Sequence, residues 1–431
     1  MIKQLTYFLI MFLGITTNLF AQKLNGLRYE DAIYEANIKT VAVYPAPVQL
    51  QDPARTTYPP VVSLDSNTPL IAEFDDLSAR FRSFRYKVFH CNADWTPSNL
   101  NDIEFTYEYN DYPINDYQSS FNTKVPYFHY VFELPKLKLP GNYVVAVYED
   151  KRPAKLVLSR RFMVYQARVN VSPQVRLSTG IAEQRTHQQI DFDIEYKGYE
   201  LLSPQDDLKI VIRQNFRWDK VLTKLRPTNV RAFDYRLEYR PFDLSNNILG
   251  GNEFRWFDTR LSRAVGMSVN DIEQLPDQTI VRLHKDASRL AGGANFQAQD
   301  LNGQYIVLNR DAANSSNEAD YLNVVFTLQS PLYPNAQVYV GGAFNLWQHD
   351  DASRMTYNNS SGAYEASMYI KQGVVNYCYY ALKGDGQMDD VSFEGSFSNT
   401  ANDYEIFVYH RPPAARADQL VGYRLIEYGR R

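Results

Sequence analysis

The chain has 431 residues, with 45 Lys and Arg against 49 Asp and Glu, 6 His and 2 Cys. The net charge of −4 excludes a generally cationic nucleic-acid binder, because neutralising phosphates requires a basic surface. Two cysteines exclude a disulfide-dense scaffold and a four-cysteine metal site. The 33 Tyr favour sheet structure.

The N-terminus has the layout of a secretory signal peptide. Lys3 supplies a positive charge, the apolar stretch Leu5–Phe20 follows, and Ala21 and Gln22 flank the expected cleavage site. The apolar stretch is shorter than the ~20 residues that span a bilayer. No Cys lies at the cleavage site to carry a lipid anchor. We therefore expect residues 1–21 to be a signal peptide and the exported chain to have no membrane insertion.

Beyond this segment, the side chains follow the pattern of strands. Phe84–Val88 and Ile190–Tyr196 alternate apolar with charged residues, as half-buried strands do. Tyr143–Tyr148 is a continuous run of β-favouring residues, typical of a sandwich core. Only Val269–Leu275 is compatible with a short helical turn. The sequence predicts an all-β fold of tandem immunoglobulin-like, early-set β-sandwiches with very little helix.

Two polar or proline-containing segments suggest the domain boundaries. Pro173 follows the first strand-rich block, and a central strand does not tolerate proline. The polar stretch Asn309–Glu318 separates a second block from a third. We therefore expect sandwiches at residues 22–170, 171–312 and 313–431, with Gly292–Gln304 as a loop.

The third block is similar to the glycogen-binding, early-set modules. The residues that carry the resemblance are Val338–Trp347, Met355, Tyr364, Gly373 and Tyr377. In that family the tryptophan binds sugar together with a lysine and a second tryptophan. Here Tyr377–Ala381 has no lysine, and Met388 stands where the second tryptophan is expected. The resemblance implies an early-set fold and leaves Trp347 as a candidate for an alternative function, periplasmic or surface glycan binding.

A second resemblance covers most of the chain. Tyr86–Leu100 looks like the hallmark motif of the type IX secretion system plug protein family of Bacteroidota. Further matching segments are Tyr117–Thr123, Tyr127–Tyr130, Pro140–Tyr143, Arg161–Phe162, Glu394–Gly395, Thr400–Tyr404, Val408–Tyr409 and Asp418–Tyr423. The resemblance implies a non-enzymatic periplasmic protein. Such a protein binds an outer-membrane translocon barrel and occludes its periplasmic mouth.

The hallmark motif contains His90, Cys91, Asn92, Asp94 and Trp95. A Cys–His pair suggests a nucleophile and its base. Adjacent strand residues point to opposite faces, however, so the two side chains are not expected to meet. The structural interpretation has Asn92 and Asp94 bonding local backbone and Trp95 closing the end of the core.

No other pattern points to catalysis, a metal or a cofactor. The sequence has no H-E-x-x-H, G-x-S-x-G or P-loop motif, and its histidines are scattered. Cys91 and Cys378 are expected to be buried free thiols, although an oxidising compartment would permit a disulfide. Adjacent acids are typical of solvated turns, and the chain has four such pairs: Asp75–Asp76, Asp206–Asp207, Asp350–Asp351 and Asp389–Asp390.

Exposed tyrosines in loops suit a surface that binds and releases a protein partner. The candidates are Tyr107, Tyr109, Tyr112 and Tyr117, together with the loop Gly292–Gln304 and Trp347. We expect a monomer before it binds the translocon barrel.

Overall fold

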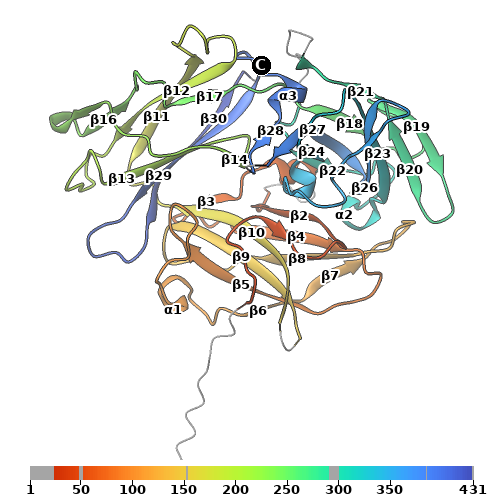
Figure 1. Ribbon diagram of the computed structural model, residues 1–431. Coiled ribbons are helices and arrows are strands. Elements are labelled where there is room, and N and C mark those ends of the chain that lie inside the picture. Colours follow the sequence, from red (N-terminus) through yellow and green to blue (C-terminus); the bar gives the residue numbers. More distant parts are fainter. Residues whose placement is uncertain (1–23, 48–51, 152–153, 291–299, 385, 430–431) are drawn as a thin grey trace, which may run out of the picture.

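The computed structural model describes residues 24–47, 52–151, 154–290, 300–384 and 386–429. The described chain is almost entirely β, which confirms the predicted fold class. It forms three two-sheet sandwiches that meet at the centre of the molecule (Figure 1). The described helices are single turns: α1 (Asp102–Phe105), α2 (Ser315–Glu318) and α3 (Val391–Glu394).

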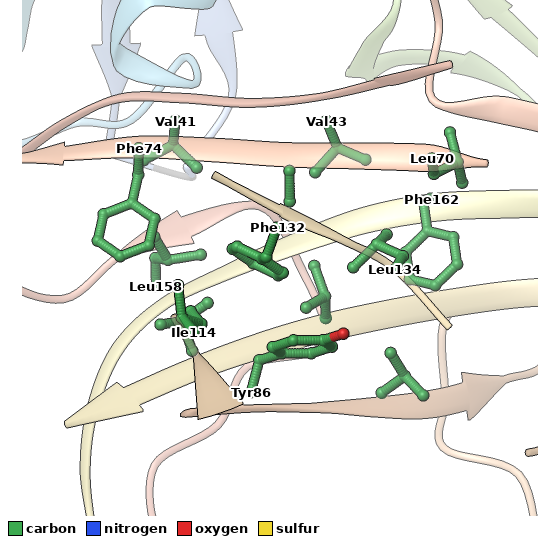
Figure 2. Packing of buried hydrophobic residues seen from close by; sticks show 14 of the residues in the cluster. Val41, Val43, Leu70, Phe74, Tyr86, Ile114, Phe132, Leu134, Leu158 and Phe162 are labelled. Carbon is green, nitrogen blue, oxygen red and sulfur yellow. The ribbon is translucent and has the colours of Figure 1, made fainter. Parts of the chain in front are cut away.

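The first sandwich lies at the bottom of Figure 1. One sheet contains β1 (Ala32–Ile33), β3 (Val61–Ser63), β5 (Phe84–Cys91), β6 (Tyr112–Ile114), β9 (Gly141–Glu149) and β10 (Lys155–Tyr165). The other contains β2 (Ile38–Pro45), β4 (Leu70–Asp76), β7 (Asp116–Ser119) and β8 (Phe128–Glu133). Val41 and Phe74 from one sheet pack against Tyr86 and Phe162 from the other (Figure 2).

The central strand β9 shows why a continuous apolar run marks a core strand. Val145 and Val147 point into the core of the first sandwich. Their neighbour Val144 lies on the opposite face, in a cluster shared with the second sandwich. Both faces of β9 are therefore buried, and alternation is absent.

The second sandwich has one sheet with β11 (Asn170–Leu177), β12 (His187–Glu195), β15 (Asn229–Arg231), β16 (Arg236–Tyr239) and β17 (Asn247–Leu249). Its other sheet has β13 (Leu208–Gln214), β14 (Arg217–Leu222), β29 (Asn402–His410) and β30 (Gln419–Tyr428). Ile190, Phe192 and Ile194 of β12 face the core, as the alternation predicted. The carboxylates between them are paired with arginines.

The third sandwich has one layer formed by β18 (Arg255–Asp258), β22 (Tyr305–Val307), β24 (Ala336–Gly341), β27 (Gly373–Lys383) and β28 (Met388–Asp389). The other layer contains β19 (Val269–Gln274), β20 (Thr279–Leu283), β21 (Asp286–Ala287), β23 (Tyr321–Gln329), β25 (Thr356–Asn358) and β26 (Ala363–Lys371). The segment expected as a helical turn is strand β19. Arg282 of the neighbouring strand β20 forms ion pairs with Asp271 and Glu273 of β19.

The strand pairing corrects the predicted ranges 171–312 and 313–431. The chain leaves the second sandwich after β17, builds the whole third sandwich from residues 255 to 394, and returns as β29. Strand β29 pairs with β13 from Leu208 opposite His410 to Gln214 opposite Tyr404. The third sandwich is thus inserted within the second, and blue β29 lies between green β13 and blue β30 (Figure 1).

Candidate functional site: the interdomain joints and the free face of the first sandwich

His90 and Cys91 lie on opposite faces of β5. The His90 ring contacts Tyr143 and Phe105 inside the first sandwich. The Cys91 side chain is in the cluster shared with the second sandwich. Burial lowers the pKa of His90 to about 4 and raises the pKa of the Cys91 thiol to about 12. A neutral imidazole and a protonated thiol on opposite faces do not form a nucleophile pair.

In the turn after β5, the Asp94 side chain bonds local backbone, whereas the Asn92 side chain bonds the Thr96 hydroxyl and reaches the second sandwich. Asp94 Oδ1 accepts hydrogen bonds from the Thr96 amide at 3.1 Å and hydroxyl at 2.6 Å. Asn92 Oδ1 accepts from Arg411 Nη2 at 2.8 Å, and the Ala93 amide donates to Asp418 Oδ2 at 3.0 Å. These last two bonds tie the hallmark motif to the loop between β29 and β30. The sequence hints at this contact only in that Asp418 begins another segment, Asp418–Tyr423, that resembles the plug protein family.

Trp95 joins two sandwiches rather than closing one core. Its ring packs edge-on against the ring of Trp218 in β14, with 4.8 Å between the ring centroids. The Arg161 guanidinium lies 4.4 Å from the Trp95 ring and 5.2 Å from the Trp218 ring. Arg213 lies 4.2 Å from the Trp218 ring and makes a buried, bidentate ion pair with Glu405. We call Trp95, Arg161, Trp218, Arg213 and Glu405 the tryptophan joint.

The first and third sandwiches meet at a buried carboxylate. Asp75 Oδ2 accepts from Lys371 Nζ and from the Tyr321 hydroxyl, each at 2.6 Å. Asp75 Oδ1 lies 2.7 Å from His129 Nδ1, and the Tyr321 hydroxyl also contacts Thr40. We call these five residues the Asp75 joint. Asp75 and Asp76 are fully buried in β4, which corrects the expectation that this acidic pair is a solvated turn.

The pKa of Asp75 shows which effect prevails in this joint. Burial alone would raise it, because an ion loses hydration in the interior. Lys371 and His129 outweigh burial and hold the pKa of Asp75 below its ordinary value. The carboxylate is therefore ionised and compensated in the folded protein.

The predicted tyrosines lie in the loop after α1 and on the edge strands β6 and β7 of the first sandwich. Tyr107, Tyr109 and Tyr117 are exposed, Tyr109 to 78%. Tyr112 is half-buried and stacks on Tyr86 at 5.0 Å, so it contributes less to this surface.

Exposed apolar residues beyond the predicted tyrosines belong to the same sandwich. Phe81 is exposed and its ring lies 4.6 Å from that of Tyr117. Ile103 and Phe121 are also exposed. Single apolar residues in loops give no periodic signal, so the sequence pattern did not identify these three. Exposed Phe81, Ile103, Tyr107, Tyr109, Tyr117 and Phe121 together form what we call the aromatic surface.

The segment that carries most of this surface is acidic, although Lys138 from elsewhere in the sandwich lies 5.1 Å from the Tyr107 ring. No Lys or Arg occurs between Lys87 and Lys124, whereas six carboxylates do: Asp94, Asp102, Glu104, Glu108, Asp111 and Asp116. Asp111 is paired with Arg85, and Glu104 with Arg416. Asp102, Glu108 and Asp116 are exposed. The combination of exposed rings and acids suits a partner that offers apolar area and cations.

Trp347 is not an open platform for a sugar. The Arg217 guanidinium lies 4.0 Å from its ring, and Phe254 packs on it at 5.8 Å. Most of the loop Gly292–Gln304 falls outside the described residues. Its end is packed inside: Asn302 is buried, and Gly303 lies close enough to Trp347 that a methyl group there would meet the ring at 3.0 Å.

The remaining predicted features concern chemistry and the N-terminus. Cys91 and Cys378 are both buried and free, as predicted. The described ranges hold no group of three or more His, Cys, Asp or Glu side chains that could bind a metal ion. In the same ranges, none of the helices is long and apolar enough to cross a membrane. The signal peptide and its cleavage site at Ala21 and Gln22 lie outside the described residues.

Comparison with known proteins gives two informative matches. Residues 38–166, which form most of the first sandwich, match the family model "Type 9 secretion system plug protein 1st domain". A solved structure of a hypothetical protein from Parabacteroides merdae ATCC 43184 has 30% sequence identity and a TM-score of 0.86. The match covers 93% of this chain and 100% of that one.

The other comparisons add no argument. No curated protein matches the chain. A structure described as manganese lipoxygenase of Gaeumannomyces graminis with partial zonadhesin of Komagataella pastoris has 8% identity. It has a TM-score of 0.14 over 91% of this chain and 94% of that one. The chain therefore belongs to the family of the Parabacteroides merdae protein, and residues 38–166 of its first sandwich are similar to the type 9 secretion system plug protein 1st domain.

Proposed function

We propose that this protein is a periplasmic plug of the type IX secretion system, which binds the outer-membrane translocon barrel and occludes its periplasmic opening. The match of residues 38–166 to the plug domain carries the proposal. A plug acts by fitting and blocking, which needs no catalytic group. The proposal accords with the neutral His90 and protonated Cys91, and with export through the expected signal peptide.

The aromatic surface supports the binding part of the proposal. It belongs to the matched domain, and the tryptophan and Asp75 joints occupy other parts of that domain. Tyrosine offers apolar contact area together with a hydroxyl that tolerates water, which suits a contact that must be released. We propose that Tyr107, Tyr109 and Tyr117 contact the barrel mouth, with the neighbouring acids guiding the approach.

Affinity isolation from native outer membranes tests this function. Tagged wild-type protein should recover the barrel. A variant with Tyr107→Ser, Tyr109→Ser and Tyr117→Ser should recover at least tenfold less, because interface rings contribute ~1–2 kcal/mol or more each. The matched control is Phe233→Ser with Phe242→Ser, which removes two almost fully exposed rings from the second sandwich. Recovery of no barrel by the wild type would contradict the function.

A permeability assay tests occlusion separately from binding. The barrel is expected to be closed either by this plug or by a second protein that delivers cargo to it. In cells that lack the second protein, deleting the plug should leave the barrel open and make the outer membrane leaky to large solutes. Re-expressing the wild-type protein should restore the barrier, and the triple tyrosine variant should not. Unchanged permeability after deletion would count against a plug.

A further inference from the structure

A cavity of about 830 Å³ lies where the three sandwiches meet. The first sandwich contributes residues of β2 and β10, the second contributes the turn between β13 and β14, and the third contributes the Ala343–Asp350 segment. Sites for small molecules are commonly found at domain interfaces and have volumes of roughly 300–1,000 Å³. The aromatic surface is separate from this cavity.

Part of the cavity wall is aromatic. Phe216 and Trp218 from the second sandwich and Phe344 and Trp347 from the third line it, and all four are half-buried. Such rings attract flat ring systems by offset or edge-on stacking. The two tryptophan rings also lie beside arginine guanidinium groups. Arg217 beside Trp347 is paired with Asp219 and Asp390, whereas Arg161 beside Trp218 has no ion pair and favours a negative charge nearby.

Most charged groups of the wall are already neutralised. Its cations Arg28, Arg160 and Arg213 pair with Glu30, Asp31 and Glu405, and its acids Glu35 and Asp219 pair with Arg82 and Arg217. Among the described lining residues, Lys39, Arg161 and Asp350 have no ion pair. The Arg161 guanidinium donates to the Tyr29 carbonyl, and Asp350 lies close enough to act electrostatically on Lys39. Asp350 is exposed at the rim, whereas Lys39 is half-buried. The unneutralised charge inside the wall is therefore positive.

Two polar atoms of the wall lack partners. The Tyr305 hydroxyl is buried without a hydrogen bond, and so is Arg160 Nε. Both Glu73 and Arg160 lie close enough to act electrostatically on the tyrosine, Glu73 more strongly. A buried donor without an acceptor costs roughly 1–3 kcal/mol, which an acceptor brought by a ligand would recover. All the spare groups inside the wall can donate: an ammonium, a guanidinium N–H and a hydroxyl.

We propose that this cavity binds a planar organic anion. Its ring stacks among Phe216, Trp218, Phe344 and Trp347, and its acid group accepts hydrogen bonds from Arg160 and Tyr305. Lys39 and Arg161, two lining cations without an ion pair, supply the positive charge. Because such a ligand contacts all three sandwiches, its binding stabilises their arrangement.

Two matched fluorescent probes test the proposal on the full chain. The anion 8-anilinonaphthalene-1-sulfonate and the uncharged N-phenyl-1-naphthylamine share one ring skeleton. The sulfonate should bind one site per chain at least tenfold more tightly than the uncharged probe. Equal affinities, or several equivalent sites, would overturn the proposal.

Variants then locate the site. Lys39→Met should weaken sulfonate binding about tenfold and leave the uncharged probe unaffected. Lys136→Met removes an exposed lysine that does not line the cavity, and it should change neither probe. Tyr305→Phe should also weaken sulfonate binding without lowering the melting temperature, because the lost hydroxyl has no partner. Equal effects of Lys39→Met and Lys136→Met would overturn the assignment.

Competition distinguishes the two natural acid groups. Displacement of the sulfonate probe by benzoate indicates a carboxylate ligand, and displacement by phenyl phosphate indicates a phosphate ligand. Displacement by uncharged benzyl alcohol and by neither anion would overturn the proposed chemistry.

Discussion

The first sandwich is fastened to its two neighbours by joints of opposite chemistry. The tryptophan joint lies within an apolar cluster that both sandwiches share, and its cations lie against aromatic rings. The Asp75 joint is a fully buried carboxylate held by an ammonium, a hydroxyl and an imidazole. Apolar contact is distributed over many atoms, whereas a buried ion depends on each partner. The two joints should therefore fail in different ways.

Removing one partner of the Asp75 joint should give the largest effect. Lys371→Met leaves the Asp75 carboxylate buried without its main compensating charge, and it should lower the free energy of unfolding by about 3–5 kcal/mol. Chemical denaturation measures this. Adding Asp75→Asn should recover a large part of the loss, because the uncompensated charge disappears. A double variant no more stable than Lys371→Met would contradict this account.

Removing the ring of Trp95 should lower stability without exposing a charge, because the Arg213–Glu405 ion pair of the tryptophan joint stays intact. Trp95→Ala should cost about 3 kcal/mol, measured in the same denaturation experiment. A Trp95→Ala and Arg161→Met double-mutant cycle should show a coupling energy of about 0.5–2 kcal/mol, because the guanidinium lies 4.4 Å from the ring. Additive losses would mean that this contact carries no energy of its own.

Acidity should act in opposite directions at two buried carboxyls. The depressed pKa of Asp75 contributes stability that is present above its unfolded pKa and is lost as the pH falls through its lower folded pKa. Burial raises the pKa of Glu253, on the crossover to the third sandwich, to about 7. The folded state then binds more protons than the unfolded state between about pH 4.5 and 7, so stability from Glu253 falls as the pH rises through that range.

The variant Glu253→Gln separates these two effects. This variant should not lose stability as the pH rises. At pH 8 its free energy of unfolding should exceed that of the wild type by on the order of 1–2 kcal/mol, and at pH 4 the two should not differ. Its amide oxygen can still accept the hydrogen bond that the Ala401 amide donates to Glu253 Oε1 at 2.8 Å. Thermal unfolding across pH 4–8 measures the difference, and parallel curves for variant and wild type would contradict it.

The aromatic surface should behave unlike either joint. Tyr109→Ser removes an exposed ring that touches no core, so the free energy of unfolding should change by less than about 0.5 kcal/mol. Barrel recovery should nevertheless fall. If stability and recovery fell together, Tyr109 would be part of the folded scaffold rather than of a binding surface.

The sequence predicted local structure well and long-range partners poorly. The alternation in Ile190–Tyr196 states which side chains face inward, and β12 has that arrangement. The sequence of β29 does not indicate that it pairs with β13. The alternation of apolar and polar residues shows which side chains are buried, but not which strand is the hydrogen-bonded neighbour. Two adjacent aspartates such as Asp75 and Asp76 are typical of a solvated turn. The partners that make burial of Asp75 favourable are distant in the sequence, and Lys371 is 296 positions away. Trp95 was recognised as structural, but its ring partner Trp218 lies in another domain.

The insertion of the third sandwich has a consequence for the order of folding. During synthesis or export, β13 emerges long before β29. The ion pair of Arg213 cannot form until Glu405, 192 residues later, has also emerged. Until then, one sheet of the second sandwich has only β13 and β14, and the edge where β29 will pair is open. Closing so long a loop is slow, and exposed strand edges invite wrong pairing. Since the third sandwich holds its core within residues 257–393, it can fold first and bring β29 back to the waiting edge. The last 30 residues of the chain thus complete a domain that the chain began near residue 170.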